Sequence, residues 1–237
     1  NPMQVRQLFD QESFTFTYLL VDEQSRRAAL IDPVREQLER DLSLVQELDL
    51  DLRYVLETHV HADHITSAAA LAERTGAVTC ASVLGAACAA HHLKDGDELQ
   101  LGDTIIRALA TPGHTRDSLS FYVQGNVFTG DALFVRGTGR TDFQSGSSDA
   151  LYDSITQKLF ALPDDTRVWP GHDYRGHAVS SIGEERRHNP RIAGKSREQF
   201  DAIMRELRLA PPKKLQIAVP ANLGCGREVA PNEGVGQ

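Results

Sequence analysis

Apolar positions along this chain follow two different periods. In some segments Thr, Phe, Tyr, Leu, Ile and Val form short runs bounded by turn residues, which is typical of buried β-strands. These runs cover residues 14–21, 28–31, 54–56, 104–109, 118–123, 127–129 and 167–169. In other segments apolar residues recur at steps of three and four among charged residues, which indicates amphipathic helices. The predicted helices cover residues 36–48, 62–75 and 147–162, and Gly76 is expected to end the second of them.

The order of these elements predicts a layered α/β protein. Strands alternate with helices, but hairpins over residues 14–31 and 118–129 interrupt the alternation. Hairpins join antiparallel strands, so we expect mixed sheets instead of purely parallel ones. The length favours one domain over residues 1–226, and the polar residues 227–237 are expected to form a flexible tail.

Composition and charge exclude several classes of protein. With 41% hydrophobic and 24% charged residues, the chain is not disordered, collagen-like or a coiled coil as a whole. The formal net charge of -8 disfavours nucleic acid and anionic lipid as general partners. No segment approaches the roughly 20 apolar residues of a membrane span, so we expect a soluble protein without a membrane partner.

The cysteines and the first residues bear on the cellular location. Cys80, Cys88 and Cys225 form neither a CxxC pair nor an even set, so we expect no disulfide framework and a reducing, cytoplasmic environment. Residues 1–6 carry neither the apolar core of an export signal nor the Arg- and Ser-rich pattern of an organelle leader.

The strongest chemical signal lies in residues 58–64, THVHADH, between a predicted strand and a predicted helix. Four potential metal ligands stand there within six positions: His59, His61, Asp63 and His64. Nitrogen and oxygen donors of this kind suit zinc or iron. The alternative is that Asp63 caps the following helix and the histidines are exposed loop residues.

Three further polar motifs also follow predicted strands. They are residues 111–115 with His114, residues 129–131 with Asp131, and residues 170–174 with His172 and Tyr174. A glycine in each motif allows close backbone approach in a loop, where functional side chains are often held by a rigid scaffold. The remaining histidines are expected at the surface: His91, His92, His177 and His188.

Together these motifs resemble the metallo-β-lactamase superfamily. Its HxHxDH motif, downstream His, Asp and final His match the residues above in order and cover most of the chain. The resemblance implies an αβ/βα sandwich of two mixed β-sheets flanked by helices, with a metal site at one edge of the facing sheets.

A narrower resemblance is to the persulfide dioxygenases, sulfur-oxidising relatives of glyoxalase II. It rests on residues 130–144 (GDALFVRGTGRTDFQ), 172–174 (HDY) and 219–226 (VPANLGCG). One departure is Thr138, where some relatives have Cys; a small polar turn residue there should leave the site unimpaired.

This second resemblance implies a mechanism and a set of roles. His59, His114 and Asp131 would bind one Fe(II) per chain and leave three coordination positions open, where glutathione persulfide and O₂ would react to sulfite and glutathione. Hydrogen-bonding groups beside the metal would be His61, Asp63, His64 and His172. Proposed substrate contacts are Arg140, Tyr174 and Cys225. For Arg140 an ion pair with Asp142 is an equal alternative, and Cys225 could simply be a small buried residue.

Two rival functions and the oligomeric state stay open at this point. A glyoxalase II-like thioester hydrolase would use a dinuclear centre to activate water, and every ligand for a second metal is present. Residues 140–144 and the lack of a longer C-terminal glutathione-binding region weigh against it. A non-catalytic metal or thiol carrier would need the open positions blocked, and no fourth strong ligand stands beside the three. A homodimer is a possible assembly.

Overall fold

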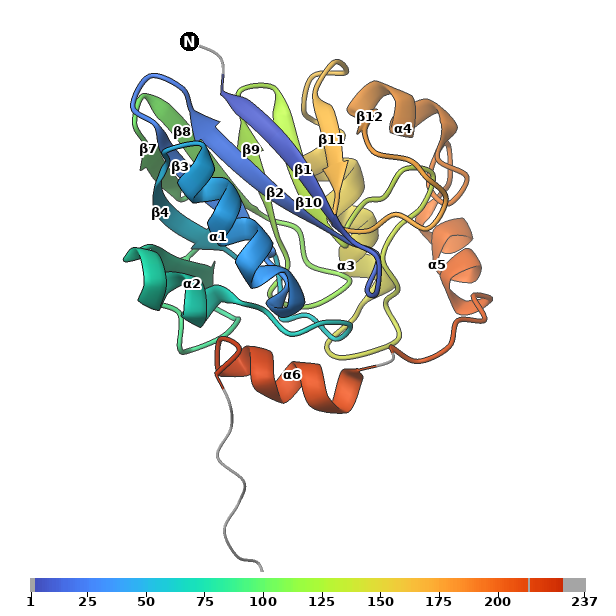
Figure 1. The fold of residues 1–237 in the computed structure, drawn as a ribbon. Helices are drawn as coiled ribbons and strands as arrows, with labels where there is room; N and C mark the ends of the chain where they lie inside the picture. Colours follow the sequence, from blue (N-terminus) through green and yellow to red (C-terminus); the bar gives the residue numbers. More distant parts are fainter. Residues whose placement is uncertain (1–2, 213, 228–237) are drawn as a thin grey trace, which may run out of the picture.

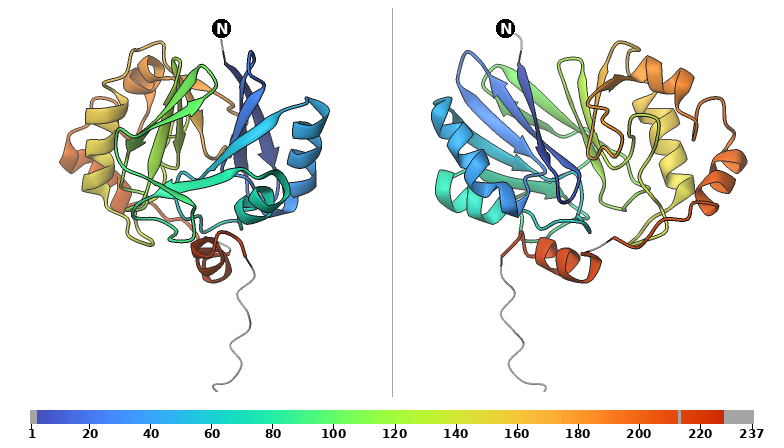
Figure 2. Two further views of the ribbon diagram at one scale, coloured as in Figure 1. Left: turned by 90° about the vertical axis from the view of Figure 1, so that its left-hand side faces the viewer. Right: turned by 45° about the vertical axis from the view of Figure 1, so that its right-hand side comes forward.

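Two six-stranded β-sheets pack face to face, and helices cover their outer faces (Figures 1 and 2). The computed structural model describes residues 3–212 and 214–227. The first sheet has the order β1-β2-β3-β4-β5-β6, antiparallel from β1 to β3 and parallel from β3 to β6. Its strands are β1 (Gln4–Asp10), β2 (Thr15–Asp22), β3 (Arg27–Ile31), β4 (Asp51–Leu56), β5 (Val78–Ser82) and β6 (His91–Leu93).

The second sheet is also mixed. Its order is β12-β11-β10-β9-β8-β7, and only β10 and β11 pair in parallel. Its strands are β7 (Glu98–Leu101), β8 (Thr104–Ala110), β9 (Leu119–Val123), β10 (Asn126–Gly130), β11 (Arg167–Pro170) and β12 (Ser180–Ser181). The predicted αβ/βα sandwich of two mixed sheets is therefore confirmed.

The helices form the outer layers and one end of the sandwich. Helices α1 (Leu38–Glu47) and α2 (Ala68–Thr75) cover the first sheet, and a 3₁₀ turn (Arg35–Gln37) precedes α1. The second sheet is covered by α3 (Ser148–Asp153), its π-helical continuation (Ser154–Leu159), α4 (Ile182–His188) and α5 (Arg197–Arg205). Helix α6 (Leu215–Leu223) lies across the end of both sheets, at the bottom of Figure 2. None of the described helices is long and apolar enough to cross a membrane.

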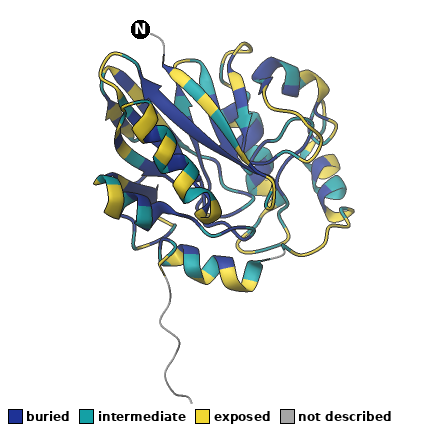
Figure 3. Ribbon diagram, viewed as in Figure 1, coloured by how far each residue is buried: buried dark blue, intermediate teal, exposed yellow. Residues whose placement is uncertain are grey.

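Aromatic side chains fill the layer between the sheets. Tyr18, Phe121 and Phe128 are fully buried there, and the rings of Tyr18 and Phe128 meet edge to face at 5.0 Å. The Tyr18 hydroxyl, on the first sheet, donates a hydrogen bond of 2.5 Å to the Pro170 carbonyl on the second. Strand β2 is buried along its whole length, as its dark colour in Figure 3 shows, because a layer covers each of its faces. This packing fixes the strand ends from which the functional loops start.

The predicted start of the second helix is wrong. The helix begins at Ala68 and not at residue 62, although Gly76, with φ of 79°, ends it as expected. The preceding residues form a loop whose backbone N–H groups are bound by side chains from elsewhere in the chain. Asp32 accepts from the N–H of Thr58, Asp117 from that of Val60, and Asn222 from that of Thr66. Of these three residues, only Thr66 lies within the predicted helix, and its N–H is bound by Asn222 and not by the carbonyl of residue 62, as a helix that begins there would require.

The two ends of the chain also differ from the sequence predictions: one strand was not predicted, and the predicted tail lies mostly outside the described residues. Strand β1 was not among the predicted strands, because its exposed edge position leaves a weak apolar pattern. Of the tail expected at residues 227–237, only Arg227 lies within the described part of the chain, and residues 228–237 lie outside it.

Asp41 on α1 provides a test of stability against pH. Its carboxyl group is buried, one oxygen accepts from Arg40 Nε at 3.0 Å, and the other has no hydrogen-bond partner among the described residues. Burial raises the pKa of Asp41 from 3.8 to about 6. The folded state therefore holds this proton more tightly than the unfolded state does. As a result, the free energy of unfolding falls as the pH rises from about 4 to about 6 and stays lowered above that range.

We expect Asp41→Asn to raise the free energy of unfolding at pH 7 by roughly 1–3 kcal/mol, because the amide removes the buried charge and still accepts from Arg40. Urea unfolding at pH 7 and pH 4 measures the effect, which should be much smaller at pH 4. An equal change at both pH values would contradict the assignment.

Candidate metal centre

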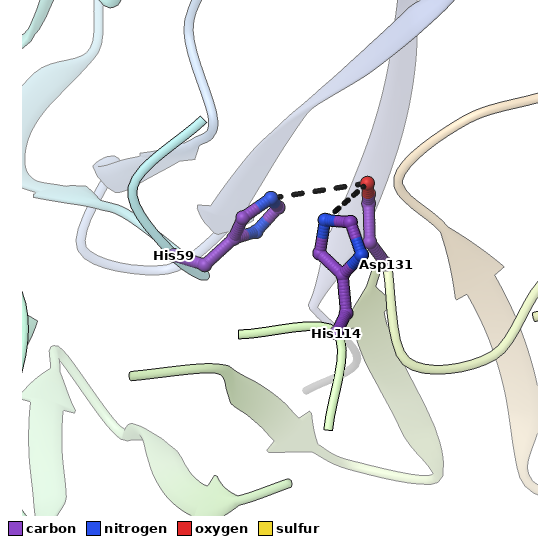
Figure 4. A group of neighbouring side chains, drawn as sticks. All are labelled: His59, His114 and Asp131. Carbon is purple, nitrogen blue, oxygen red and sulfur yellow. Dashed lines mark ion pairs between the residues drawn. The ribbon is translucent and has the colours of Figure 1, made fainter. Parts of the chain in front are cut away.

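The four predicted motifs meet at one edge of the sandwich. His59 follows β4 of the first sheet, whereas His114, Asp131 and His172 follow β8, β10 and β11 of the second. Figure 4 shows the side chains of His59, His114 and Asp131 turned toward one another from these loops. One donor atom from each of the three lies within 4.8 Å of the others. The convergence expected from the sequence is therefore present in the fold.

The hydrogen bonds of His59 place its proton on Nδ1 and leave a lone pair on Nε2. The Thr58 hydroxyl donates to Asp32 Oδ2 at 2.7 Å, so its oxygen is free only to accept at its other contact. That contact is His59 Nδ1 at 2.9 Å, which must therefore carry the proton. Burial, followed by the charge of His61, lowers the pKa of His59 well below its ordinary value. The imidazole is thus neutral and presents Nε2 toward Asp131 as a ligand.

His114 is fixed in the same tautomer by a backbone group. Its Nδ1 lies 2.7 Å from the carbonyl oxygen of Arg140, which can only accept. Nδ1 therefore carries a proton, and Nε2 is the nitrogen that is available to a metal ion. The backbone of Arg140, and not its side chain, orients this imidazole.

Asp131 completes the group. Its Oδ2 lies 3.8 Å from His59 Nε2 and 3.2 Å from His114 Nε2. Burial alone would raise the pKa of Asp131, but the neighbouring imidazoles, His172 before the others, outweigh it and hold the pKa well below its usual range. Nε2 of both imidazoles is turned toward one carboxylate oxygen, so a cation placed among these three atoms would be bound by all of them. The donor set thus fits a divalent metal ion, and a two-histidine, one-carboxylate set with open positions is typical of non-haem iron.

Close packing holds Asp131 in this position. A Cβ atom on Gly139 would come within 2.0 Å of the Asp131 carbonyl oxygen, and one on Gly171 within 2.7 Å of its Oδ1. Both positions therefore require glycine, because a Cβ atom at either one would overlap with Asp131.

The other predicted groups form a network beside these three. Asp63 Oδ1 lies 3.0 Å from His64 Nδ1, and Asp63 Oδ2 lies 2.9 Å from His172 Nε2, which is also 3.3 Å from Asp131 Oδ1. His172 Nδ1 donates to the carbonyl of Phe14 at 3.0 Å. Asp63 is not a helix cap, because it binds two imidazoles and α2 begins only at Ala68. A second set of possible metal donors is His61, Asp63 and His64.

His61 is held from the side away from Asp63 by two carboxylates. Its Nε2 lies 3.1 Å from both Asp32 Oδ1 and Glu57 Oε2. Burial alone would lower the pKa of His61, but Asp32 and Glu57 outweigh it and raise the pKa well above its ordinary value. Nδ1 of His61 and Nε2 of His64 are buried without a hydrogen-bond partner in the part of the chain that the structure describes.

Residues 58–67, between β4 and α2, are called the metal loop below. Sequence reasoning missed three residues that hold this loop: Asp32, Glu57 and Asn222. Asp32 directly follows β3 and Glu57 directly follows β4, so the strand-end signal used for the other motifs would have found them. Asn222 Oδ1 accepts from Thr66 N at 2.8 Å, and its Nδ2 donates to the carbonyls of His61 and His64 at 3.0 and 2.7 Å. Only the resemblance at residues 219–226 pointed to this position.

The proposed substrate contacts lie around the metal centre in different settings. The Arg140 guanidinium binds Asp142 through two hydrogen bonds of 2.7 and 2.9 Å and lies 4.4 Å above the Phe143 ring. The Asp142 ion pair expected as an alternative is thus confirmed. Tyr174 is 63% exposed, and its ring stacks on His172 at 5.9 Å. The roles of Arg140 and Tyr174 in substrate binding remain predictions.

The expectation that the chain has no disulfide is wrong. Cys88 and Cys225 are joined, with their Cα atoms 6.1 Å apart. They lie 137 positions apart in the sequence, and only the fold brings the end of α6 to the loop between β5 and β6. Cys80 is free and buried, and burial raises its pKa to about 12. A direct substrate contact by Cys225 remains a prediction.

The remaining histidines lie away from the metal centre. His91, His177 and His188 are exposed, as expected, and His92 is half-buried. His91 and His92 belong to strand β6 and not to a helix.

Comparisons with known proteins show the family to which the chain belongs. The metallo-beta-lactamase superfamily profile matches residues 11–172. Mitochondrial persulfide dioxygenase ETHE1 from Bos taurus is 45% identical over 98% of this chain and 92% of the bovine protein, and that from Homo sapiens is 46% identical over 95% and 89%. The crystal structure of ETHE1 from Myxococcus xanthus superposes with a TM-score of 0.94, at 59% identity, over 95% of this chain and 100% of that one. The chain therefore belongs to the metallo-β-lactamase superfamily and, within it, to the persulfide dioxygenase family.

Proposed function

We propose that the protein is an Fe(II)-dependent dioxygenase that oxidises glutathione persulfide with O₂ to sulfite and glutathione. The observation that carries this proposal is the set of His59, His114 and Asp131, in which hydrogen bonds fix both imidazoles with Nε2 free. Relatives that are 45% and 46% identical over nearly the whole chain are named persulfide dioxygenases, which supports the same substrate class here.

One Fe(II) held by these three residues would supply adjacent open positions at which the persulfide sulfur and O₂ react. The chain's own groups prepare this site. The low pKa of Asp131 keeps its carboxylate charged at neutral pH, and the Thr58 hydroxyl and the Arg140 carbonyl keep the imidazoles from rotating.

His172 holds a proton beside the donor set. Its Nδ1–H is bound by the Phe14 carbonyl, and its Nε2 faces carboxylate oxygens of Asp63 at 2.9 Å and Asp131 at 3.3 Å. Burial alone would lower the pKa of His172, but Asp131 and Asp63 outweigh it and raise the pKa well above its ordinary value. Nε2–H is therefore a positioned donor next to the reacting groups.

The entrance to the site offers aromatic and polar surfaces. Tyr174 lies 5.5 Å from Phe14 and 6.4 Å from Phe134, measured between ring centroids, which places an aromatic wall beside His172. We propose that this wall contacts the peptide part of glutathione, and that a glutathione carboxylate binds Arg140 in place of Asp142, which holds its guanidinium in this structure. We also propose that the protein has no nucleic-acid partner, because the net charge of -8 repels polyanions.

The test is an oxygen-electrode assay on anaerobically purified protein with measured metal content. We expect about one iron per chain, O₂ uptake on addition of glutathione persulfide, and one sulfite released per O₂ consumed. S-lactoylglutathione is the matched control substrate and should be hydrolysed slowly or not at all.

The opposite result would assign the rival function. Rapid hydrolysis of S-lactoylglutathione without O₂ uptake, by protein that holds two metals per chain, would identify a dinuclear thioester hydrolase. The donors available for a second metal at His61, Asp63 and His64 make this comparison necessary.

A further inference from the structure

The Cys88–Cys225 disulfide ties the C-terminal end of the chain to the first sheet. Cys225 follows α6, and Cys88 lies in the loop between β5 and β6. Cys225 is only 6% exposed, whereas Cys88 is half-buried. A thiol from solution therefore reaches the sulfur of Cys88 more readily than that of Cys225.

The residues around Cys225 also hold the metal loop. The Cys225 carbonyl accepts from Ala69 N at 3.2 Å, and Cys225 N donates to the Asn222 carbonyl at 3.0 Å. The Asn222 side chain binds the backbone of residues 61, 64 and 66. A Cβ atom on Gly226 would come within 2.0 Å of the Thr66 carbonyl oxygen, so the chain after the disulfide packs directly on this loop.

A small cavity connects the disulfide with a metal ligand. It has a volume of about 20 Å³ and is lined by Cys225 on one side and by His59 on another, with Asn222 and Glu57 also in its wall. A space of this size holds one water molecule. Cys225 and His59 thus border the same small space.

We propose that the Cys88–Cys225 disulfide is a thiol-exchange site for low-molecular-weight thiols. A thiolate attacks Cys88 Sγ, the bond to Cys225 breaks, and Cys225 leaves as a thiolate that takes a proton from water. A second thiolate attacks the outer sulfur of this mixed disulfide, which forms the disulfide of the low-molecular-weight thiol, and Cys88 leaves as a thiolate that takes a proton from water. The exchange breaks the covalent link between α6 and the β5–β6 loop. The hydrogen bonds between Asn222 and the metal loop are weakened as a result.

Glutathione is the probe, and the first readout is native alkylation followed by mass spectrometry of the peptides, which locates each label and each glutathione adduct. Protein purified without reductant should take no label at Cys88 or Cys225. Brief exposure to glutathione should give one glutathione adduct on Cys88, and longer exposure should give two labelled thiols. Cys80→Ser is the control and should label identically, because Cys80 is buried. Two free thiols before reduction, resistance to glutathione, or an adduct on Cys225 would each overturn the exchange site.

The second readout is the rate at which metal passes to EDTA. Glutathione should raise this rate several-fold in the parent, and Cys88→Ser should show the raised rate from the start with no further response to glutathione. If both thiols become labelled while the release rate stays unchanged, the coupling to the metal loop is wrong. Neither readout requires persulfide oxidation. The two experiments therefore test the exchange site independently of the proposed dioxygenase activity.

Discussion

Asp131→Ala should leave the protein folded but unable to retain its metal. Asp131 is the only carboxylate in the group with His59 and His114, and its Oδ2 faces both free nitrogens. Without it the site loses one of three ligands and the charge that offsets a divalent ion. We expect metal affinity to fall by more than about 100-fold, since even groups that only orient ligands contribute 10–100-fold. Metal analysis after dialysis measures the loss, and circular dichroism checks the fold.

Asp63→Asn is the matched control for this prediction. Asp63 contacts His64 and His172 but belongs to neither the first donor set nor its orienting hydrogen bonds. This variant should keep one iron per chain and lose activity by about 10–100-fold. If the parent holds two metals, Asp63→Asn loses one of them and Asp131→Ala stays loaded, the assignment of ligands is wrong.

Asn222→Ala should destabilise the fold strongly, because one side chain satisfies three backbone groups. It accepts from Thr66 N and donates to the carbonyls of His61 and His64, and Asn222 itself is 4% exposed. Each buried group left without a partner costs about 1–3 kcal/mol, so we expect the free energy of unfolding to fall by at least about 3 kcal/mol. Urea unfolding with the disulfide intact gives the value.

Gln216→Ala is the control on the same helix, at an exposed position. It should change the free energy of unfolding by no more than about 0.5 kcal/mol. Equal effects of the two substitutions would show that helix α6 as a whole, and not the Asn222 side chain, supports the metal loop.

Local pattern predicted the elements well where a strand or helix is set by its own sequence. Strands β2, β3 and β8 and helix α1 lie within a few residues of the predicted ranges, and Gly76 ends α2 as expected. The start of α2 could not be predicted, because the backbone before it is held by side chains from distant parts of the chain. The sequence of residues 62–67 contains no sign of those partners.

The candidate site could also be predicted in part from the sequence. The positions of the four motifs after predicted strands could be read from the sequence, but the choice of His59, His114 and Asp131 as the metal ligands came from the resemblance to the persulfide dioxygenases. The disulfide could not be anticipated, because its two cysteines meet only through the position of α6. Long-range contacts of this kind depend on topology and not on local composition.

The metal donors come from both sheets: His59 follows a strand of the first, whereas His114 and Asp131 follow strands of the second. A bound ion therefore joins the two halves of the sandwich in addition to any chemistry that it performs, and the unfolded chain has no such site. By mass action, a free metal concentration 100 times the dissociation constant adds about 2.7 kcal/mol to the stability of the folded state. The supply of metal would thus raise the stability of the folded protein as well as the fraction of it that can react.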